Sequence, residues 1–387
     1  MGKYPSVSDK SKLASVEKLC LLEDPYEIND QTNDLFVEAM KEVLLWHCEH
    51  CHFYDDLLNS HSFDPRSIRS ISDIEKIPYI LANFFKKHEI LSIDRNDVFL
   101  HLTSSGTTGQ KSQIFFDEWT IQSAQRMVDM IYRCYGWITP DSPTNYLLYG
   151  HEPEEGSKLG TAFTDNFLCK YAPVNEARYA LRYTGDKNHK FDLFGCIEAL
   201  KKYELEGLPV RIFGFPSFLY FTLKQMEKLG FSPLKLSKDS LVFLGGGWKS
   251  HQDKAISKEE FYALASKMLG IPNERLRDGF GSVEHCVPYI ECSKHHFHVP
   301  VWSKVLIRDV KTLEVLGYDK IGYLNFVSPY ITSVPANSVL MGDLAVLHDA
   351  NDCDCELGTP WFEVKGRAGV SKNRSCAIAA AELLKDF

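Results

Sequence analysis

A stretch rich in hydroxyl groups and glycine carries the strongest chemical signal in the sequence. Its residues are Thr103, Ser104, Ser105, Gly106, Thr107, Thr108, Gly109, Gln110, Lys111 and Ser112. Glycines let the backbone approach an anion and turn its N–H groups toward it, and the hydroxyls and the Lys111 ammonium add further donors. The stretch lacks the GxxxxGK[ST] spacing of the Walker-type loop. By itself it fits either a phosphate-binding loop or a plain surface loop.

Three later segments favour the first alternative, because they supply in order what a nucleotide site needs. A glycine run after an expected strand can pack against a flat ligand, and an FGSVE segment offers an aromatic ring for stacking and a carboxylate for Mg²⁺. A Gly-Asp pair offers a carboxylate for the ribose hydroxyls. The residues expected to contact the nucleotide are Gly245, Gly246, Phe280, Gly281, Glu284, Asp343 and Arg367. Each segment alone is a weak signal, but together they predict a nucleotide site.

With these segments in this order, the sequence resembles the adenylate-forming enzymes, the acyl-CoA ligase superfamily, from about Asp34 to Arg367. The resemblance implies that the loop from Thr103 binds phosphates, that Glu284 holds Mg²⁺ and that Asp343 holds the ribose. The sequence is most similar to the phenylacetate-CoA ligase branch. Closer still are the acyl-protein synthetases of the bacterial luminescence fatty-acid reductase complex. An α/β large domain and an acyl-AMP intermediate are therefore expected.

The sequence departs from the superfamily pattern at two places. The superfamily usually has Pro-Lys after its GTTGx, whereas Gln110-Lys111-Ser112 moves the lysine by one place. Only about 20 residues follow Arg367, where the superfamily usually carries a further domain with a catalytic lysine. We therefore expect a large domain over residues 1–363, with a helical region at about 30–95, and a short, truncated C-terminal tail over 364–387.

The tail contains a candidate nucleophile, Cys376. The alanine-rich run that follows it predicts a helix, which Asn373 or Ser375 can cap. A helix N-terminus and the nearby cations Lys372 and Arg374 both favour the thiolate. In the acyl-protein synthetases a cysteine close to the C-terminus accepts the acyl group, so the resemblance implies this role for Cys376. The alternative is a small apolar residue that packs a terminal helix.

Four further residues have the spacing of two metal half-sites. Cys292 and His298 are separated by five residues, and Cys353 and Cys355 by one. Two thiolates, or a thiolate and an imidazole, held close in sequence are typical of structural zinc sites. The turn-rich, polar surroundings of Cys353 and Cys355 argue against simple core burial. His295 and His296 are rival third ligands, and four unrelated surface residues are the alternative.

A second Cys/His cluster is denser but less suited to metal. Residues 47–52 read His-Cys-Glu-His-Cys-His at the end of a strongly helical segment. Consecutive side chains on a helix point in different directions. We therefore expect this run to be the end of a helix rather than a metal site.

Apolar periodicity indicates the elements that must position these residues. Helical spacing runs from Asn33 to Leu58 and, interrupted at Pro78, from Arg69 to Leu91. Further helices are expected over Gln122–Tyr135, Phe191–Leu205, Ser217–Lys228 and Lys258–Leu269, and strands over Val98–Leu102, Tyr146–Tyr149, Val210–Phe213 and Leu241–Leu244. This alternation predicts a largely parallel α/β sheet, followed after about Pro300 by a smaller β-rich region.

The aromatic run from Phe213 to Phe221 lies near the presumed sheet edge and has two interpretations. It could line an acyl pocket, because ligand pockets are mostly apolar with a few polar groups. It could equally be the packed junction of a strand and a helix.

Composition limits the possible partners. The 387 residues exceed what a single core usually supports, and the formal charge of −9 disfavours nucleic acid and acidic membranes. No apolar run is long enough to span a bilayer and no signal peptide is present, so we expect a cytoplasmic protein. Its 11 cysteines should then be thiols, ligands or catalytic groups rather than disulfides.

The sequence therefore predicts an ATP-dependent ligase with Mg²⁺ and structural zinc. It would convert a carboxylic acid, by resemblance a long-chain fatty acid, into acyl-AMP and then into a thioester on Cys376. The resemblance implies a reductase partner and an acyl-transferase as a further one. Two alternatives remain: a stand-alone ligase that passes acyl-AMP to coenzyme A, a carrier protein or an amine, and a non-catalytic protein that binds nucleotide and zinc.

Overall fold

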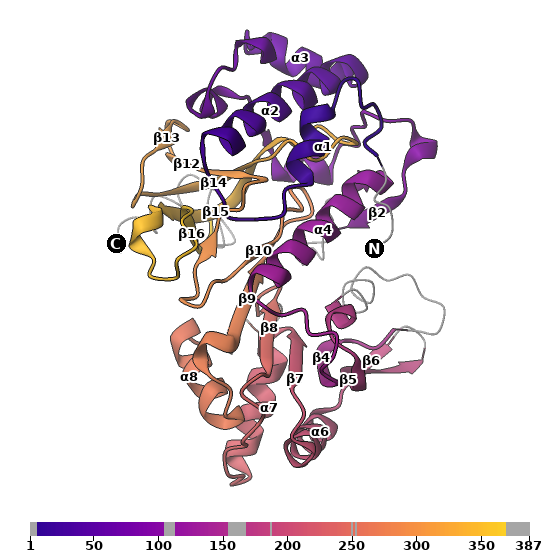
Figure 1. Ribbon diagram of the computed structural model, residues 1–387, viewed down its shortest axis with the longest axis vertical. Coiled ribbons are helices and arrows are strands. Elements are labelled where there is room, and N and C mark those ends of the chain that lie inside the picture. Colours follow the sequence, from indigo (N-terminus) through magenta and orange to yellow (C-terminus); the bar gives the residue numbers. More distant parts are fainter. Residues whose placement is uncertain are drawn as a thin grey trace. The chain divides into compact units, whose positions relative to one another are not determined.

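The computed structural model describes residues 6–103, 113–153, 168–185, 188–248, 251 and 254–368. The chain divides into two compact units (Figure 1). The split unit contains Met1–Cys134, Gly281–Tyr289 and His296–Phe387, whereas the inserted unit contains Tyr135–Phe280 and Ile290–His295.

The split unit begins with the helices α1 (Ala14–Cys20), α2 (Asp30–His50) and α3 (His52–Ser60). A capping box starts α2, because the Asn29 side chain accepts from the Thr32 N–H and the Thr32 hydroxyl accepts from the Asn29 N–H. Cys51 has an extended backbone and separates α2 from α3. The helical region predicted over Asn33–Leu58 is thus confirmed as two helices. The predicted helix at Gln122–Tyr135 is α4 (Glu118–Cys134).

The segment Arg69–Leu91 forms no α-helix, in contrast to the prediction. It contains two 3-10 helices, η2 (Ile71–Lys76) and η3 (Ala82–Lys86), on either side of the short strand β1 (Ile80–Leu81). Pro78 disfavours a helical Ile77 before it, and Ile77 is extended with ψ 124°. β1 instead pairs in parallel with β15, with Ile80 opposite Val339.

The β-rich region predicted after Pro300 is present in the split unit. The path through its sheet is β11-β16-β15-β14-β12-β13, and all neighbours on that path are antiparallel. The strands are β11 (Phe297–His298), β12 (Lys304–Arg308), β13 (Val315–Leu316), β14 (Ile321–Val327), β15 (Ser338–His348) and β16 (Trp361–Arg367). The boundary expected at residues 363–364 falls inside β16, and the assignment of a separate tail stays a prediction.

The inserted unit has the predicted parallel α/β arrangement. Its sheet has the order β10-β9-β8-β7-β4-β5-β6, with β5, β4, β7, β8 and β9 parallel and β6 antiparallel at the edge. The elements are β4 (Thr144–His151), β5 (Val174–Gly185), β6 (Asn188–Phe191), α6 (Leu193–Glu206), β7 (Val210–Gly214), α7 (Pro216–Lys228), β8 (Leu241–Gly245), α8 (Lys258–Leu269), β9 (Leu276–Phe280) and β10 (Tyr289–Ile290).

Successive side chains along these strands point to opposite faces of the sheet, and both faces are packed. Leu147, Ile212 and Val242 belong to one buried cluster with apolar side chains of α6, α7 and α8, which lie along the sheet (Figure 1). The adjacent residues Phe213 and Phe243 face the other way, and their rings contact each other with centroids 6.2 Å apart. The strand period of two residues thus buries both faces.

The remaining elements are short. β2 (Leu100–Thr103) and β3 (Gln113–Phe116) form an antiparallel pair of their own. Single 3-10 turns occur at η1 (Pro65–Ser67), η4 (Arg95–Asp97), η5 (Cys169–Tyr171), η7 (Asn273–Arg275) and η8 (Ala350–Asp352).

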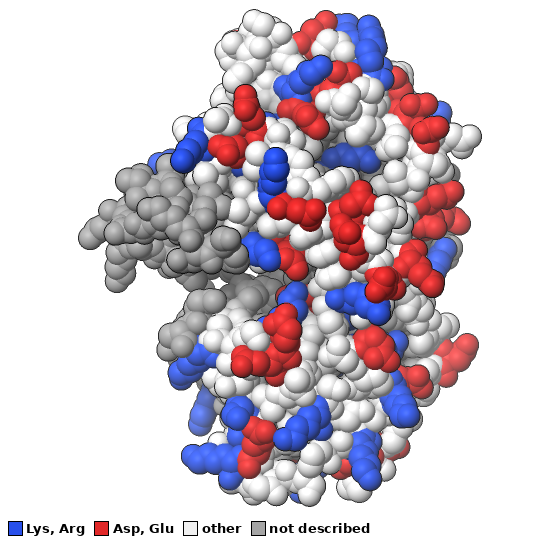
Figure 2. Space-filling model, turned by 90° about the vertical axis from the view of Figure 1, so that its left-hand side faces the viewer, with Lys and Arg blue, Asp and Glu red and all other residues white. Residues whose placement is uncertain are grey.

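The surface carries charges of both signs. On the face drawn in Figure 2, lysines and arginines are interspersed with aspartates and glutamates.

Among the described residues, no helix is both long enough and apolar enough to cross a bilayer.

Candidate functional site

The predicted phosphate loop connects the two strands of a hairpin. β2 ends at Thr103 and β3 begins at Gln113, and these two residues face each other in the antiparallel register. The two ends of the loop are therefore held side by side. Residues Ser104–Ser112, including Lys111, lie outside the described residues, and so does Cys376. Their predicted roles stay predictions.

The glycine run and the FGSVE segment begin at adjacent strand ends in the inserted unit. Gly245 at the end of β8 is paired with Gly279 in β9, and Phe280 follows directly. A Cβ on Gly245 would lie 3.6 Å from the Gly279 carbonyl oxygen, and Gly246 has φ +75°, which favours glycine. In open α/β sheets, ligands bind beyond the carboxyl ends of parallel strands. The structure thus places Gly245, Gly246 and Phe280 at the carboxyl ends of parallel strands, and their contact with a nucleotide stays a prediction.

Glu284 lies in a tight turn of the split unit. The Cys286 N–H donates to the Ser282 carbonyl over 2.7 Å, and Cys286 adopts a φ of +57°. The Glu284 side chain is only 6% exposed. Within the described part of the chain, neither a cation nor a hydrogen-bond donor contacts its carboxylate. A buried carboxylate without such a partner is costly, so the site suits a cation.

His285 holds this turn in place, and sequence analysis did not identify it. Its ring is buried and stacks on Phe326, with centroids 4.5 Å apart and planes 7° apart. Its Nε2 is 2.9 Å from the Tyr289 hydroxyl, which in turn lies 2.9 Å from the Ser303 hydroxyl. Burial lowers the pKa of His285 to about 3, so this ring is neutral. The sequence signal that could have identified His285 is its position directly after Glu284.

Asp343 and Arg367 meet across two neighbouring strands of the split unit. Asp343 on β15 is opposite Arg367 on β16, and the Arg367 Nε lies 3.4 Å from the Asp343 Oδ1. Burial raises the pKa of Asp343, Arg367 opposes that shift, and the negative charge of Glu284 adds to it. The two carboxylates are therefore close enough to repel each other electrostatically. The split unit brings together two buried carboxylates and one exposed guanidinium from three predicted segments.

The four predicted metal ligands converge. The ligand atoms of Cys292, His298, Cys353 and Cys355 all lie within 4.8 Å of one another. The Cys355 Sγ is 3.1 Å from the His298 Nε2. Cys292 lies on the short stretch Ile290–His295, which is continuous in the chain with β11. Three sulfurs and one imidazole nitrogen match the Cys₃His donor set of structural zinc sites.

Contacts around these ligands favour their metal-binding forms. The His298 Nδ1 lies 2.8 Å from the Thr359 carbonyl oxygen, so Nδ1 carries the proton and Nε2 keeps its lone pair. The Lys294 N–H donates to the Cys292 sulfur over 3.3 Å, and the His296 Nδ1 is 3.1 Å from the Cys353 sulfur. His296 also stacks on Trp361 with centroids 3.6 Å apart. His296 thus contacts a ligand but is not one of the four.

A buried carboxylate anchors the segment that carries Cys292. Glu291 is fully buried, accepts from the Tyr262 hydroxyl over 2.7 Å and from the Asp278 N–H over 2.8 Å, and forms an ion pair with Lys258. Burial together with the charge of Glu291 raises the pKa of Asp278 to about 7. Sequence analysis did not identify this network, because its members are spread over three elements.

The aromatic run Phe213–Phe221 contributes to the core at the junction of β7 and α7, one of its two interpretations. Phe213 and Leu219 are buried in the core. Phe218 is partly exposed, and its ring centroid lies 5.8 Å from that of His251. Gly214 has φ +117°, and a Cβ there would lie 2.4 Å from the Tyr149 carbonyl oxygen, so the chain turns sharply at this point. An acyl pocket along this run stays a prediction.

Known proteins resemble this chain over almost its full length. The family described as "Acyl-protein synthetase, LuxE" matches residues 5–385. A long-chain-fatty-acid–luciferin-component ligase of Aliivibrio fischeri is 23% identical over 378 residues, which cover 96% of this chain and 95% of that protein. The ligase of the same description from Vibrio harveyi is 25% identical over 316 residues, covering 81% and 79%.

Solved structures agree on the fold. An open conformation of 2-hydroxyisobutyryl-CoA ligase in complex with 2-HIB-AMP and CoA matches with a TM-score of 0.63 and 11% identity, covering 91% of this chain and 78% of that one. At this identity the likeness establishes the fold, which is that of an adenylate-forming ligase. Taken with the family match, the chain belongs to the acyl-protein synthetase family, LuxE, whose members are ligases that activate a carboxylic acid as an acyl adenylate and join it to a thiol.

Proposed function

We propose that this chain activates a long-chain fatty acid with ATP, receives the acyl group on its own Cys376 and delivers it to a reductase partner. The observation that carries the proposal is the pair of buried carboxylates, Glu284 and Asp343, in a chain of this family. Two relatives of similar length act on long-chain fatty acids by name, which supports the same substrate class here.

The first half-reaction is adenylation. A carboxylate oxygen of the acid attacks the α-phosphorus of ATP, the bond to the β-phosphate oxygen breaks, and pyrophosphate leaves with the electron pair. The loop from Thr103 to Lys111 supplies N–H groups, hydroxyls and an ammonium toward the phosphates. Asp343 accepts from the ribose hydroxyls, while Phe280, Gly245 and Gly246 form the adenine surface.

Glu284 would hold Mg²⁺, which when bound neutralises charge on the phosphates. The fit rests on the buried carboxylate without a partner among the described residues. It also rests on a second carboxylate, Asp343, whose pKa is raised in part by the charge of Glu284. The stack of His285 on Phe326 fixes the turn and so fixes the direction of the Glu284 side chain.

The second half-reaction is transfer to a thiol. The Cys376 thiolate attacks the acyl carbon of acyl-AMP, a C–S bond forms, the bond from the acyl carbon to the phosphate oxygen breaks, and AMP leaves. A thiolate is the nucleophilic form of cysteine, and Lys372 and Arg374 in the sequence favour it. The thioester is then the form handed to the reductase, and an acyl-transferase would be a further partner.

A structural zinc ion completes the proposal. Cys292, His298, Cys353 and Cys355 would bind it, and the Thr359 carbonyl would hold His298 in the required tautomer. Because Cys353 and Cys355 lie between β15 and β16, the ion would tie the connection between these two strands to β11.

Two measurements on the same samples test the function. Purified chain with ATP, Mg²⁺ and a panel of acids is assayed for acid-dependent ATP–pyrophosphate exchange and by intact mass spectrometry. Wild type should show exchange and gain one acyl mass that hydroxylamine removes. Glu284→Gln should lose exchange at least about 100-fold while remaining folded, because it removes the charge of a preorganised ligand but keeps its shape.

Cys376→Ser separates the two half-reactions. It should keep exchange near the wild-type rate and lose the stable acyl adduct, because a serine hydroxyl is far less ionised. Cys134→Ser, which removes an exposed thiol, is the matched control and should keep both properties. An acyl group on a different cysteine, or equal acylation of Cys376→Ser, would favour transfer to coenzyme A, a carrier protein or an amine instead.

A further inference from the structure

A separate apolar groove lies in the N-terminal part of the split unit. It has a volume of about 380 Å³ and is formed by α3 and by the segment around β1 and η3. Its lining residues are Phe53, Leu57, Tyr79, Ile80, Leu81, Asn83, Phe84, Lys87 and His88. None of them belongs to the nucleotide, acyl or metal residues described above.

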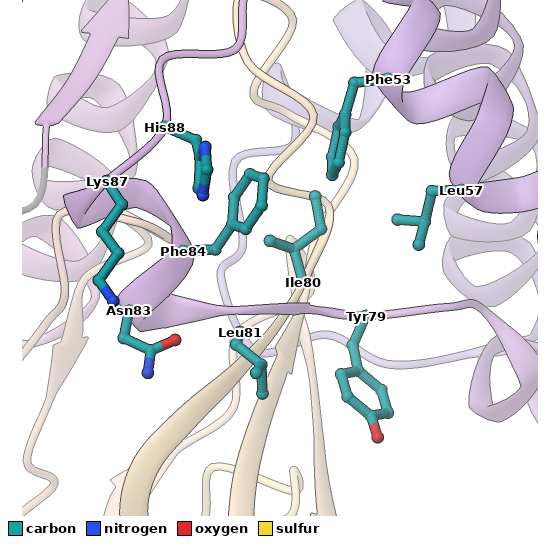
Figure 3. Close-up of a pocket in the computed structure, with 9 residues that line it drawn as sticks. All are labelled: Phe53, Leu57, Tyr79, Ile80, Leu81, Asn83, Phe84, Lys87 and His88. Carbon is teal, nitrogen blue, oxygen red and sulfur yellow. The ribbon is translucent and has the colours of Figure 1, made fainter.

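The apolar wall of the groove is built from stacked rings and aliphatic side chains. Phe53 of α3 stacks on Phe84 of η3 with centroids 4.9 Å apart, and Phe84 stacks on His88 with centroids 4.2 Å apart. Leu81 is 50% exposed although it borders the groove. Ile80 lies between the two sides in Figure 3. The wall is thus held in shape by contacts among its own residues while leaving apolar surface uncovered.

One end of the groove is polar. Lys87 and Asn83 lie together at one end of the labelled group, and Leu57 lies at the other (Figure 3). Lys87 is exposed, and within the described ranges no carboxylate forms an ion pair with it. No acidic residue lines the groove. An ammonium without a counter-ion at the end of an apolar slot is complementary to a molecule with an anionic head and an apolar tail.

We propose that this groove binds a single long-chain fatty acid, with its carboxylate at Lys87 and its chain against Phe84, Phe53 and Leu57. A volume of about 380 Å³ suits one small molecule and is too small for the face of a docked helix. The choice of a fatty acid rests on the proposed function for the nature of the available amphiphile. The site lies in addition to the one at which the acid is activated.

Photolabelling locates the bound acid. The full chain is saturated with an acyl sulfamoyl adenosine, a stable mimic of acyl-AMP, and then irradiated with hexadecanoic acid carrying a diazirine near its methyl end. Peptide mass spectrometry should find label within residues 53–57 and 79–88 even with the mimic present. Label confined to the inserted unit, or label near the groove that the mimic abolishes, would overturn the proposal.

Charge reversal tests the role of Lys87. Lys87→Glu should weaken binding of the acid about five- to tenfold, because attraction of one ion pair is replaced by repulsion. Binding of hexadecanol, which lacks the carboxylate, should be unchanged. Lys86→Glu makes the same charge change at a neighbour that does not line the groove. It should leave the binding of the acid and the binding of hexadecanol unchanged. Equal effects of the two reversals would contradict a specific contact.

The exchange assay separates this inference from the proposed function. Wild type, Lys87→Glu and Lys86→Glu should all retain ATP–pyrophosphate exchange, since the groove holds no residue of the activation site. Exchange without groove labelling refutes the groove alone. Groove labelling without exchange in wild type refutes the proposed function alone.

Discussion

Two regions of the molecule are rich in cysteine and histidine, yet they use these residues in opposite ways. Residues 47–52 place five such side chains within six positions, whereas Cys292, His298, Cys353 and Cys355 are spread over 64 positions. In the dispersed group the ligand atoms lie within 4.8 Å of one another. In the dense run the side chains separate.

His47 shows what the dense run does instead. Its ring is fully buried, with Nδ1 2.6 Å from the Ser92 hydroxyl and Nε2 3.1 Å from the Ile331 carbonyl oxygen. His52 points away at the start of α3, with its side chain 88% exposed. Both nitrogens of His47 are therefore used within the fold, and none is left for a metal ion.

The difference has a geometric cause. On a helix, consecutive residues point in different directions, so closeness in sequence does not place ligand atoms together. The dispersed group is assembled by β11 and by the connection between β15 and β16, where chain reversals return distant residues to one place. Spacing in pairs is thus a better indicator of a metal site than density.

The largest expected effect comes from removing two ligands of the dispersed group. Cys353→Ser with Cys355→Ser should abolish bound zinc, measured by elemental analysis against about one ion per chain in wild type. Metal-binding energy is also folding energy, so the melting temperature should fall by roughly 10 °C. Cys48→Ser with Cys51→Ser is the matched control and should retain the metal. A wild type that contains no zinc after gentle purification would refute the site.

A smaller loss of stability is expected at His47. His47→Ala leaves the Ser92 hydroxyl and the Ile331 carbonyl without their buried partner, so the free energy of unfolding should fall by about 2–4 kcal/mol. Urea unfolding measures this change. His52→Ala, at an exposed position, should change it by less than about 0.5 kcal/mol. Zinc content should be unaltered in both, and loss of zinc in His47→Ala would contradict the separation of the two regions.

The smallest expected effect is a change in pH dependence. Burial lowers the pKa of His47 to about 3, whereas an unfolded histidine has a pKa of about 6.5. Between these values the unfolded chain binds a proton that the folded chain does not, so stability falls as the pH falls below 6.5. From pH 7 to pH 5, wild type should therefore lose about 2 kcal/mol more than His47→Gln. Parallel curves for the two proteins would show that His47 is accessible to protons when folded.

Much of the fold follows from the periodicity of the sequence. Short continuous apolar runs predict β4, β7 and β8, because a parallel sheet covered by helices requires continuous apolar strands. The helical spacing of apolar residues between these runs predicts the helices. The prediction failed at Arg69–Leu91, where Pro78 and the pairing of Ile80 with Val339 outweigh a local helical pattern. That partner lies far away in the sequence and leaves no local trace.

The candidate site is predictable only in its residue types. Glu284, Asp343 and Arg367 have recognisable motifs, whereas the residues that hold them do not. His285 supports the Glu284 turn through Phe326 and Tyr289, and Glu291 anchors the Cys292 segment through Tyr262 and Lys258. Such supporting contacts join positions with no fixed spacing. They become visible only when the chain is folded.

The interruption of the split unit by the inserted unit has a consequence for synthesis on the ribosome. β1 at Ile80–Leu81 must pair with β15 at Val339–Leu340. β1 and the helices α1 to α3 therefore leave the ribosome long before β15, which completes the sheet of the split unit. The inserted unit is almost continuous in sequence, and we expect it to fold first while the N-terminal segment waits. Protease digestion of stalled nascent chains should therefore show a protected inserted unit before α2 becomes resistant. We therefore expect the buried residues of α2 to stay accessible to chaperones until β15 has been synthesised.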